Sequence, residues 1–237
     1  MNLTTLPTAM PTRAVLIFAD SARLDLSRRR LPTAALALFR SPELASSDFG
    51  DADVHVFGSA SCRVRDGQQF HPQCGGSFAQ RFESAIETLA SLGYSEVVAV
   101  GRDCPALVAA DIGQAFAELR DHRLVLGPDH RGGCYLIALH TSDRGLLRGV
   151  RWNHNTDCAQ LCDRSGPSTV FLLPVKHDID SWADLKFAAQ VNERVARLAA
   201  FLLQTIGVSL IERPPIFHAA AQFVRLHGQI PPPASAG

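Results

Sequence analysis

The stretch Glu96-Val-Val-Ala-Val-Gly-Arg-Asp-Cys-Pro105 decides the fold that this sequence predicts. Its first half is a short apolar run, which is typical of a strand buried on both faces of a parallel sheet. Its second half is polar and contains Pro105, which fixes a turn, so Asp103 follows the strand directly. We therefore expect a central strand whose carboxyl end presents a carboxylate.

Similar apolar runs alternate with segments of helical periodicity on both sides of this stretch. Further strands are expected at 14–19, 54–57, 124–126, 134–139 and 168–173, and helices at 32–40, 78–92, 108–120, 155–162 and 181–203. Segments 20–30 and 58–76 are expected to be loops. This alternation predicts an α/β fold: a three-layer mixed, mostly parallel sheet with helices on both faces.

The chain of 237 residues is long enough for one large α/β domain. Residues 1–12 carry two prolines and no periodicity, so we expect a flexible leader. Residues 13–207 hold the alternating strands and helices and are expected to form the domain. Residues 208–237 are expected to form an appendage that ends in a disordered Pro-rich tail, because the tail has almost nothing to bury.

Composition excludes several classes of partner. Lys plus Arg equals Asp plus Glu at 23 each, so net charge gives no reason to expect nucleic acid or an anionic membrane. No signal peptide and no run of about 18 apolar residues is found, and the six cysteines contain no C-x-x-C pair. We expect a reduced, cytoplasmic protein.

The amphipathic piece 216–226 could dock on a partner subunit, so a homo-oligomer is one expectation.

Acidic residues follow two expected strand ends and are the main candidates for chemistry. Ligands of open α/β sheets bind at the carboxyl ends of the strands. Asp103 lies at one such end, and Asp178-Ile-Asp180 lies at another, just before a helix that Ser181 caps. Carboxylates so placed can hold Mg²⁺, because this ion takes few carboxylates and completes its shell with phosphate oxygens. The alternative for each acid is a helix or turn cap, which the residues alone leave open.

Positive charge and glycine occur in two further loops. Arg28-Arg29-Arg30 follows the first expected strand and can contact phosphate, although a solvated surface run is the alternative. Segment 127–133 is expected to turn between two strands, and its paired glycines permit either ligand approach or simply a tight turn. No G-x-S-x-G, P-loop, H-E-x-x-H or G-x-G-x-x-G pattern is present, which removes the simplest hydrolase, kinase, metalloprotease and Rossmann interpretations.

Five segments together resemble one known pattern. They are Val97-Val-Ala-Val-Gly-Arg-Asp-Cys-Pro105, Asp111-Ile-Gly-Gln-Ala-Phe116, Val125-Leu-Gly-Pro128, Gly132-Gly-Cys-Tyr-Leu-Ile137 and Asp178-Ile-Asp-Ser-Trp-Ala-Asp-Leu185. In order and spacing they resemble a bacterial family of glycosyltransferase-A-like proteins known as domain of unknown function 2064. That family is related to guanylyltransferases of the deazaflavin and molybdopterin cofactors. The resemblance extends from about residue 14 to about residue 189.

The resemblance implies a nucleotide-diphospho-sugar transferase fold that binds a nucleotide or nucleotide-sugar. It implies that Asp103 and Asp180 are the catalytic residues and hold Mg²⁺ or Mn²⁺ between them. In the first loop the family has P-G-x-V-K-T-R-L, so Arg28 takes the place of its lysine and Arg30 that of its arginine. A second family pattern, Q-x-G-x-D-L-G-x-R, ends here at Arg81. These three arginines are the implied phosphate ligands.

The resemblance also implies a substrate loop, in which the chain departs from the family. The family's E-D-G-G-Y-Y-L corresponds to His130-Arg-Gly-Gly-Cys-Tyr-Leu136. Gly132 and Gly133 are kept, whereas Arg131 replaces an acid and reverses the local charge. Trp152 keeps its place in the same implied site.

These features lead to a main hypothesis and two alternatives. The main hypothesis is a metal-dependent nucleotidyl- or glycosyltransferase acting on an unidentified small-molecule acceptor. The first alternative is a catalytically decayed nucleotide-binding or scaffold module of the same fold, motivated by Arg131 and by Arg102, which replaces a serine or threonine. An arginine salt-bridged across the metal position would favour it. The second alternative, a thiol enzyme using Cys104, is disfavoured because the adjacent Asp103 carboxylate should raise the pKa of the thiol.

Overall fold

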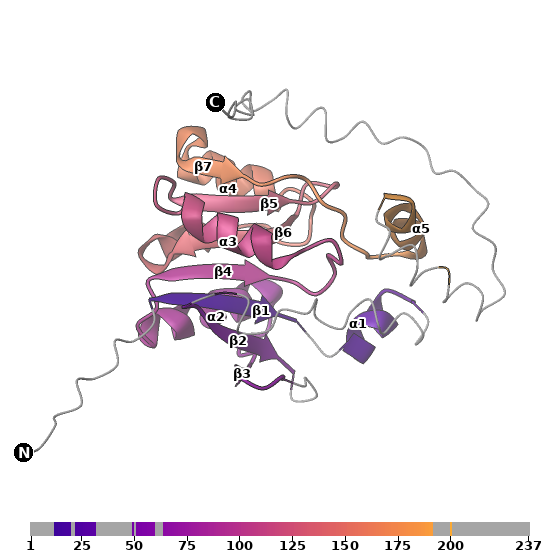
Figure 1. The fold of residues 1–237 in the computed structure, drawn as a ribbon, viewed down its shortest axis with the longest axis horizontal. Coiled ribbons are helices and arrows are strands. Elements are labelled where there is room, and N and C mark those ends of the chain that lie inside the picture. The colour runs from indigo at the N-terminus through magenta and orange to yellow at the C-terminus, as the bar shows by residue number, and fades with distance from the viewer. Residues whose placement is uncertain are drawn as a thin grey trace, which may run out of the picture.

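The structure, a computed structural model, describes residues 12–19, 22–31, 49, 51–59, 64–191 and 200 (Figure 1). Its strands are β1 (Arg13–Phe18), β2 (Asp53–Gly58), β3 (Gln68–Pro72), β4 (Glu96–Val100), β5 (Leu124–Pro128), β6 (Cys134–His140) and β7 (Val170–Leu172). Its α-helices are α1 (Ala22–Arg28), α2 (Phe78–Ser91), α3 (Ala109–Glu118), α4 (Asp157–Ser165) and α5 (Trp182–Val191). Two 3-10 helices are η3 (Thr141–Leu147) and η4 (Pro167–Thr169).

The strands form one seven-stranded sheet in the order β3-β2-β1-β4-β6-β5-β7. Strand β6 runs antiparallel to its neighbours β4 and β5, whereas every other pair is parallel. The expected mixed, mostly parallel sheet is therefore confirmed. Strands β2 and β3 extend the sheet on one side of β1, and β4 lies on the other side. The strand order thus reverses between β1 and β4, which is where open α/β sheets bind ligands.

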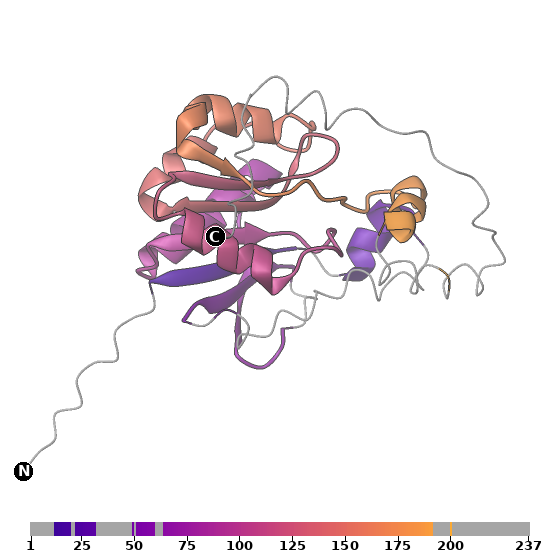
Figure 2. The same cartoon turned by 45° about the horizontal axis from the view of Figure 1, so that its top comes forward.

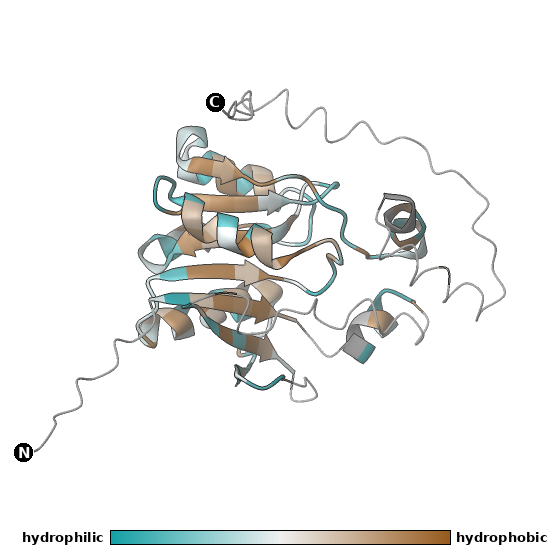
Figure 3. Ribbon diagram, viewed as in Figure 1, coloured by the Kyte–Doolittle hydropathy of each residue, from teal (hydrophilic) through white to brown (hydrophobic). Residues whose placement is uncertain are grey.

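Helices cover both faces of this sheet and confirm the three-layer arrangement. Along β1, Val15 and Ile17 belong to the core cluster that includes α3, whereas Ala14 and Leu16 belong to the cluster that includes α2 and α4. The alternation arises because successive side chains of a strand point to opposite faces. All four side chains are buried, as expected for a strand between two layers. In Figure 3 the apolar colour is accordingly concentrated in the strands.

Helix α2 shows how local sequence fixes the ends of an element. The Ser77 hydroxyl accepts a hydrogen bond from the backbone N–H of Gln80, and the Gln80 side chain accepts one from the backbone N–H of Ser77. Gly93, at φ +95°, closes the other end in a left-handed conformation that glycine adopts readily. The helix expected at 78–92 is thus confirmed, and its buried face consists of Phe82, Ala85, Ile86 and Leu89.

Two expectations for loops are wrong, and one expected strand is shorter than predicted. Segment 58–76, expected to be a loop, contains β3, an edge strand whose polar residues and Pro72 give no apolar run. Segment 20–30, also expected to be a loop, contains α1, so Arg28 lies in the last turn of a helix. The strand expected at 168–173 is shortened to β7, because its first part belongs to η4.

Other expectations lie outside the described residues. They are the helix at 32–40, nearly all of the last helix beyond Val191, the leader before Thr12 and the appendage 208–237. Thr12 itself accepts hydrogen bonds at its carbonyl from the backbone N–H groups of Ser95 and Glu96. In the part of the chain that is described, no helix is both long and apolar enough to cross a membrane.

His55 brings a titratable group into the core. Its side chain is fully buried on β2, and its Nδ1 lies 2.9 Å from Nε2 of His71 on β3. Burial, followed by the charge of His71, lowers the pKa of His55 from 6.5 to about 4, and Asp53 opposes this shift. His55 is therefore neutral in the folded protein at pH values where the unfolded chain carries a proton on it.

We expect the fold to lose stability as the pH falls from 7 towards 4. The unfolded state binds a proton on His55 that the folded state does not bind, so this residue alone should cost about 2 kcal/mol at pH 5 relative to pH 7. Urea unfolding of the wild type and of His55→Leu at both pH values measures the effect. Between pH 7 and pH 5 the free energy of unfolding should drop less in the variant than in the wild type. Equal drops in the two proteins would show that His55 is not the cause of the pH dependence.

Candidate functional site

A cavity of about 320 Å³ lies at the carboxyl ends of β1 and β4, next to the first residues of β6. This is the point at which the strand order reverses. Five aspartates, accompanied by Arg29, dominate its polar lining, and they are Asp103, Asp129, Asp157, Asp178 and Asp180. In Figures 1 and 2, helices α1 and α5 lie side by side beyond this end of the sheet.

Asp103 and Asp180 meet at this cavity through one guanidinium group. Nη2 of Arg29 donates to Oδ2 of Asp103 at 2.8 Å, and Nη1 of Arg29 donates to Oδ1 of Asp180. The backbone N–H of Ile179 donates to the carbonyl of Asp103 at 2.8 Å, which joins the turn after β4 to the segment before α5. Asp103 and Asp180, which are distant along the chain, therefore face the same guanidinium group of Arg29.

Gly101 determines where the carboxylate of Asp103 lies. A Cβ atom at position 101 would overlap Oδ1 of Asp103, so glycine leaves room for the carboxylate in the position that it takes here. The Asp103 side chain is 27% exposed and lines the cavity. The Gly-Arg-Asp sequence at this strand end thus folds a carboxylate back towards the ligand side of the sheet.

Asp180 is bound through its second oxygen by the loop between β5 and β6. Nη2 of Arg131 donates to Oδ2 of Asp180, and Nη1 of Arg131 donates to Oδ2 of Asp184 at 3.3 Å. Asp184 also accepts hydrogen bonds from the backbone N–H of Asp180 at 3.1 Å and from the hydroxyl of Ser181 at 2.8 Å. The expected cap at the start of α5 is present, and it holds Arg131 at the site.

Asp129 organises the predicted substrate loop. Its Oδ1 accepts hydrogen bonds from the backbone N–H groups of Arg131, Gly132 and Gly133 at 2.6, 2.7 and 2.9 Å. Gly132 has a φ of +104°, and a Cβ atom there would overlap the carbonyl oxygen of Asn155. Turn geometry therefore explains Gly132, and the turn fixes the position from which Arg131 reaches Asp180.

Asp178 is a deeply buried acid of the site. The residue is 7% exposed and lines the cavity, and its Oδ1 has no hydrogen-bond partner within the described chain. Burial raises the pKa of Asp178 well above its usual value, and Asp103 and Asp129 raise it further, whereas Arg29 and Arg131 oppose the shift. A buried carboxylate oxygen without a partner is costly, so this atom is suited to accept a proton or to face a cation.

The donor atoms fit the chemistry of a hard divalent cation that also binds phosphate. Carboxylate oxygens are the ligands that Mg²⁺ and Mn²⁺ prefer, and Mg²⁺ at nucleotide sites takes one or two carboxylates with phosphate oxygens. Over the described ranges, no group of three or more His, Cys, Asp or Glu side chains is arranged to hold a metal ion. A cation at Asp103 and Asp180 would therefore depend on oxygens of its ligand as well.

The arginines implied as phosphate ligands do not line the cavity. Arg28, Arg30 and Arg81 are absent from its lining in the described part of the chain. Arg81 instead fastens the loop before α2, donating from Nε to Oε1 of Gln73 at 3.0 Å and from Nη1 to the carbonyl of Gly76 at 2.7 Å. The role of these three arginines as phosphate ligands stays a prediction.

Arg29 belongs to the arginine cluster that the sequence offers, but the family resemblance singles out only its two neighbours. Arg29 lies between the two arginines that match the family pattern, at a position where the family has threonine. The pattern therefore gives no reason to select this residue. Two other implied residues do reach the cavity. Gly133 lines it directly, and Trp152 forms part of its wall while packing edge-on against Phe82, with the ring centroids 5.2 Å apart.

Cys104 is buried beside the site, with 2% exposure. Burial raises the pKa of its thiol, and the charges of Asp178 and Asp103 raise it further. The thiol therefore stays protonated at neutral pH, a state in which it is a poor nucleophile. The geometry thus gives no support to a thiol enzyme.

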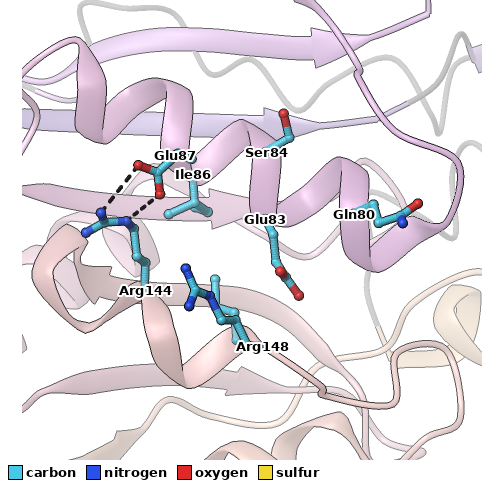
Figure 4. A pocket seen from close by; sticks show the side chains of 8 residues that line it. Gln80, Glu83, Ser84, Ile86, Glu87, Arg144 and Arg148 are labelled. Carbon is cyan, nitrogen blue, oxygen red and sulfur yellow. Dashed lines mark hydrogen bonds and ion pairs between the residues drawn. The ribbon is translucent and has the colours of Figure 1, made fainter.

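A second cavity, of about 300 Å³, lies between α2 and η3 (Figure 4). Its lining is charged, and Nε of Arg144 lies 2.5 Å from Oε2 of Glu87. None of its lining residues in the described ranges comes from the carboxyl end of a strand. We therefore assign the candidate site to the first cavity, where loops from several strands converge.

The sequence profile of the family described as "Uncharacterized protein conserved in bacteria (DUF2064)" matches residues 26–154, which is more than half of the chain. This chain belongs to the DUF2064 family. The match includes Arg29, Asp103 and the loop that carries Arg131, whereas Asp180 lies beyond it. A comparison of this DUF2064 member with curated proteins found no match.

Solved structures share the fold of this DUF2064 protein at low sequence identity. A candidate nucleotide-diphospho-sugar transferase from Desulfovibrio desulfuricans G20 has a TM-score of 0.67 at 20% identity, covering 83% of this chain and 98% of that one. A cytidylyltransferase from Leptospira borgpetersenii has 0.52 at 12% identity, covering 87% and 99%. A 4-diphosphocytidyl-2C-methyl-D-erythritol synthase from Anaerococcus prevotii has 0.51 at 10% identity, covering 82% and 99%. The DUF2064 chain has the glycosyltransferase-A-like fold of nucleotide-diphospho-sugar transferases.

Proposed function

We propose that this DUF2064 protein binds a nucleotide or nucleotide-sugar together with Mg²⁺ or Mn²⁺ and transfers a nucleotidyl or glycosyl group to a small-molecule acceptor. The observation that carries the proposal is the meeting of Asp103 and Asp180 at the carboxyl ends of the strands. The names of the similar structures, a nucleotide-diphospho-sugar transferase and a cytidylyltransferase among them, support a nucleotide as the class of ligand.

Each residue at the cavity has a role that its chemistry supports. Asp103 and Asp180 would hold the cation, which when bound neutralises phosphate charge and orients the leaving group. Arg29 and Arg131 carry planar guanidinium groups, which pair well with phosphate oxygens. Trp152 supplies an apolar wall, and the cavity of about 320 Å³ is large enough to enclose part of a nucleotide.

A second candidate function is a module that binds nucleotide without catalysis. It is favoured by the salt bridge between Arg131 and Asp180 and by Arg29, which bridges Asp180 and Asp103. These two guanidinium groups supply positive charge where a cation would otherwise supply it, so the carboxylates are satisfied without metal. Such a module would bind its nucleotide equally well in the absence of a divalent cation.

Calorimetric titration with GTP, CTP and a UDP-sugar, each with Mg²⁺ or with a chelator, separates the two functions. We expect at least one ligand to bind at least about tenfold more tightly with Mg²⁺, a difference of about 1.4 kcal/mol. An affinity that is the same with Mg²⁺ and with chelator would support the module that binds nucleotide without catalysis. No binding of any ligand would contradict both functions. Metal-dependent release of pyrophosphate or of a nucleoside diphosphate would establish an enzyme.

A further inference from the structure

We infer that Arg29 is a built-in counter-ion that holds Asp103 and Asp180 together in the cation-free protein and is displaced when a divalent cation binds them. The inference rests on the proposed function, because it concerns the regulation of the same pair of carboxylates. It gives Arg29 a role as a competitor of the cation, which differs from the phosphate-binding role implied for Arg28 and Arg30.

The contacts of Arg29 account for this role. One nitrogen of its guanidinium donates to Asp103 at 2.8 Å, and the other donates both to the carboxylate of Asp180 and, at 2.8 Å, to the carbonyl of Ile179. The side chains of Arg29 and Asp103 are 19% and 27% exposed, whereas that of Asp180 is 46% exposed, so the bridge is shielded from water mainly on the Asp103 side. A guanidinium holds its N–H groups in a fixed planar fork, and here the fork spans one oxygen of each acid.

A cation that binds Asp180 competes with a guanidinium group at either carboxylate oxygen. Oδ1 of Asp180 is bound by Arg29, and Oδ2 is bound by Arg131. A divalent ion placed among these oxygens would also lie within a few Å of the Arg29 charge, and like charges at that distance repel strongly in a partly buried site. Arg29 is the one of these two arginines that also forms an ion pair with Asp103. Its guanidinium therefore lies between the two carboxylates, where a cation bound to both would lie.

The backbone around Arg29 allows its side chain to leave while the chain stays in place. Helix α1 ends at Arg28, and the chain turns at Arg30, which has a left-handed φ of 54°. Leu26 and Leu31 are buried on either side of this turn, and the backbone N–H of Leu31 donates to the carbonyl of Leu26 at 2.9 Å. Rotation of the Arg29 side chain would then bring its charge next to the phosphates of a metal-bound nucleotide.

Titration with Mn²⁺ alone, followed by electron paramagnetic resonance of the free ion, tests the inference without any substrate. Arg29→Gln should bind Mn²⁺ at least about tenfold more tightly than the wild type, because the competing charge is gone. Arg23→Gln is the matched control: Arg23 is an exposed arginine on the same helix, and its loss should leave Mn²⁺ affinity unchanged. Arg29→Lys keeps one charge but lacks the fork, and it should bind Mn²⁺ with intermediate affinity.

The possible outcomes separate this inference from the proposed function. If the wild type and Arg29→Gln both bind Mn²⁺ with equal affinity, the counter-ion role is wrong and the metal site stands. If neither binds Mn²⁺, either alone or in the presence of CTP or GTP, both are wrong. If Arg29→Gln fails to fold, as circular dichroism would show, Arg29→Lys decides, and an affinity equal to that of the wild type would overturn the inference.

Discussion

Asp103→Asn is expected to weaken Mn²⁺-dependent nucleotide binding by about 100-fold, which corresponds to about 2.8 kcal/mol of binding free energy. The amide has the shape of the carboxylate but no charge, so the cation loses one of its two anionic protein ligands. Arg29 loses a charged partner at 2.8 Å in the same variant, so its guanidinium is freer to compete for Asp180. Calorimetric titration with CTP and GTP in excess Mn²⁺ measures the loss.

Asp163→Asn provides the matched control for this measurement. Asp163 is an exposed aspartate on α4 that does not line the cavity, so its amide variant should bind nucleotide like the wild type. If the Asp103 and Asp163 variants bind with the same affinity in Mn²⁺, Asp103 is not a ligand of the cation. The module that binds nucleotide without metal would then be the better description of the protein.

Lys176→Met is expected to lower the free energy of unfolding by about 3–5 kcal/mol. Nζ of Lys176 forms an ion pair with Asp111 and donates to the carbonyl of Ala106 at 2.9 Å, and the two charged side chains are only 15% and 12% exposed. Without the ammonium group the Asp111 carboxylate stays buried and loses its counter-ion, which costs more than the pair contributed. Thermal unfolding should show a melting temperature lower by roughly 10 °C.

The double variant Lys176→Met/Asp111→Asn tests whether the unpaired charge is the cause. Asparagine at position 111 can still accept the hydrogen bond that the carboxylate takes from the backbone N–H of Val108 at 2.8 Å. It should therefore recover at least about 1 kcal/mol relative to the single variant. A single variant that melts like the wild type, or a double variant that melts below the single one, would show that burial of charge is not what makes Lys176 important.

The fold could be predicted from the sequence wherever a strand is apolar on both faces. Strands β1 and β4 consist mostly of buried apolar residues, so each carries a clear local signal. Strand β3 carries none, because an edge strand is partly exposed and tolerates polar residues and Pro72. Its pairing with β2 depends on tertiary context, which local propensity does not encode.

The carboxylate pair of the site could be predicted, but its arginine could not. Asp103 and Asp180 both come after expected strands, whose carboxyl ends lie at one edge of the sheet. Asp180 lies eight residues beyond the end of β7, and the hydrogen bond from the Ile179 N–H to the Asp103 carbonyl joins its segment to the turn after β4. Arg28, Arg29 and Arg30 are equivalent in sequence, and consecutive residues near a helix end point in very different directions. Which of the three faces the acids depends on how α1 docks, and only the structure gives that.

Anomalous diffraction from crystals grown with Mn²⁺ and CTP or GTP tests most directly whether Asp103 and Asp180 share one cation. We predict a manganese peak within roughly 2.5 Å of one carboxylate oxygen from each residue, with the Arg29 guanidinium moved to the phosphates. A manganese ion bound to the nucleotide alone, with Arg29 still between the two carboxylates, would contradict this.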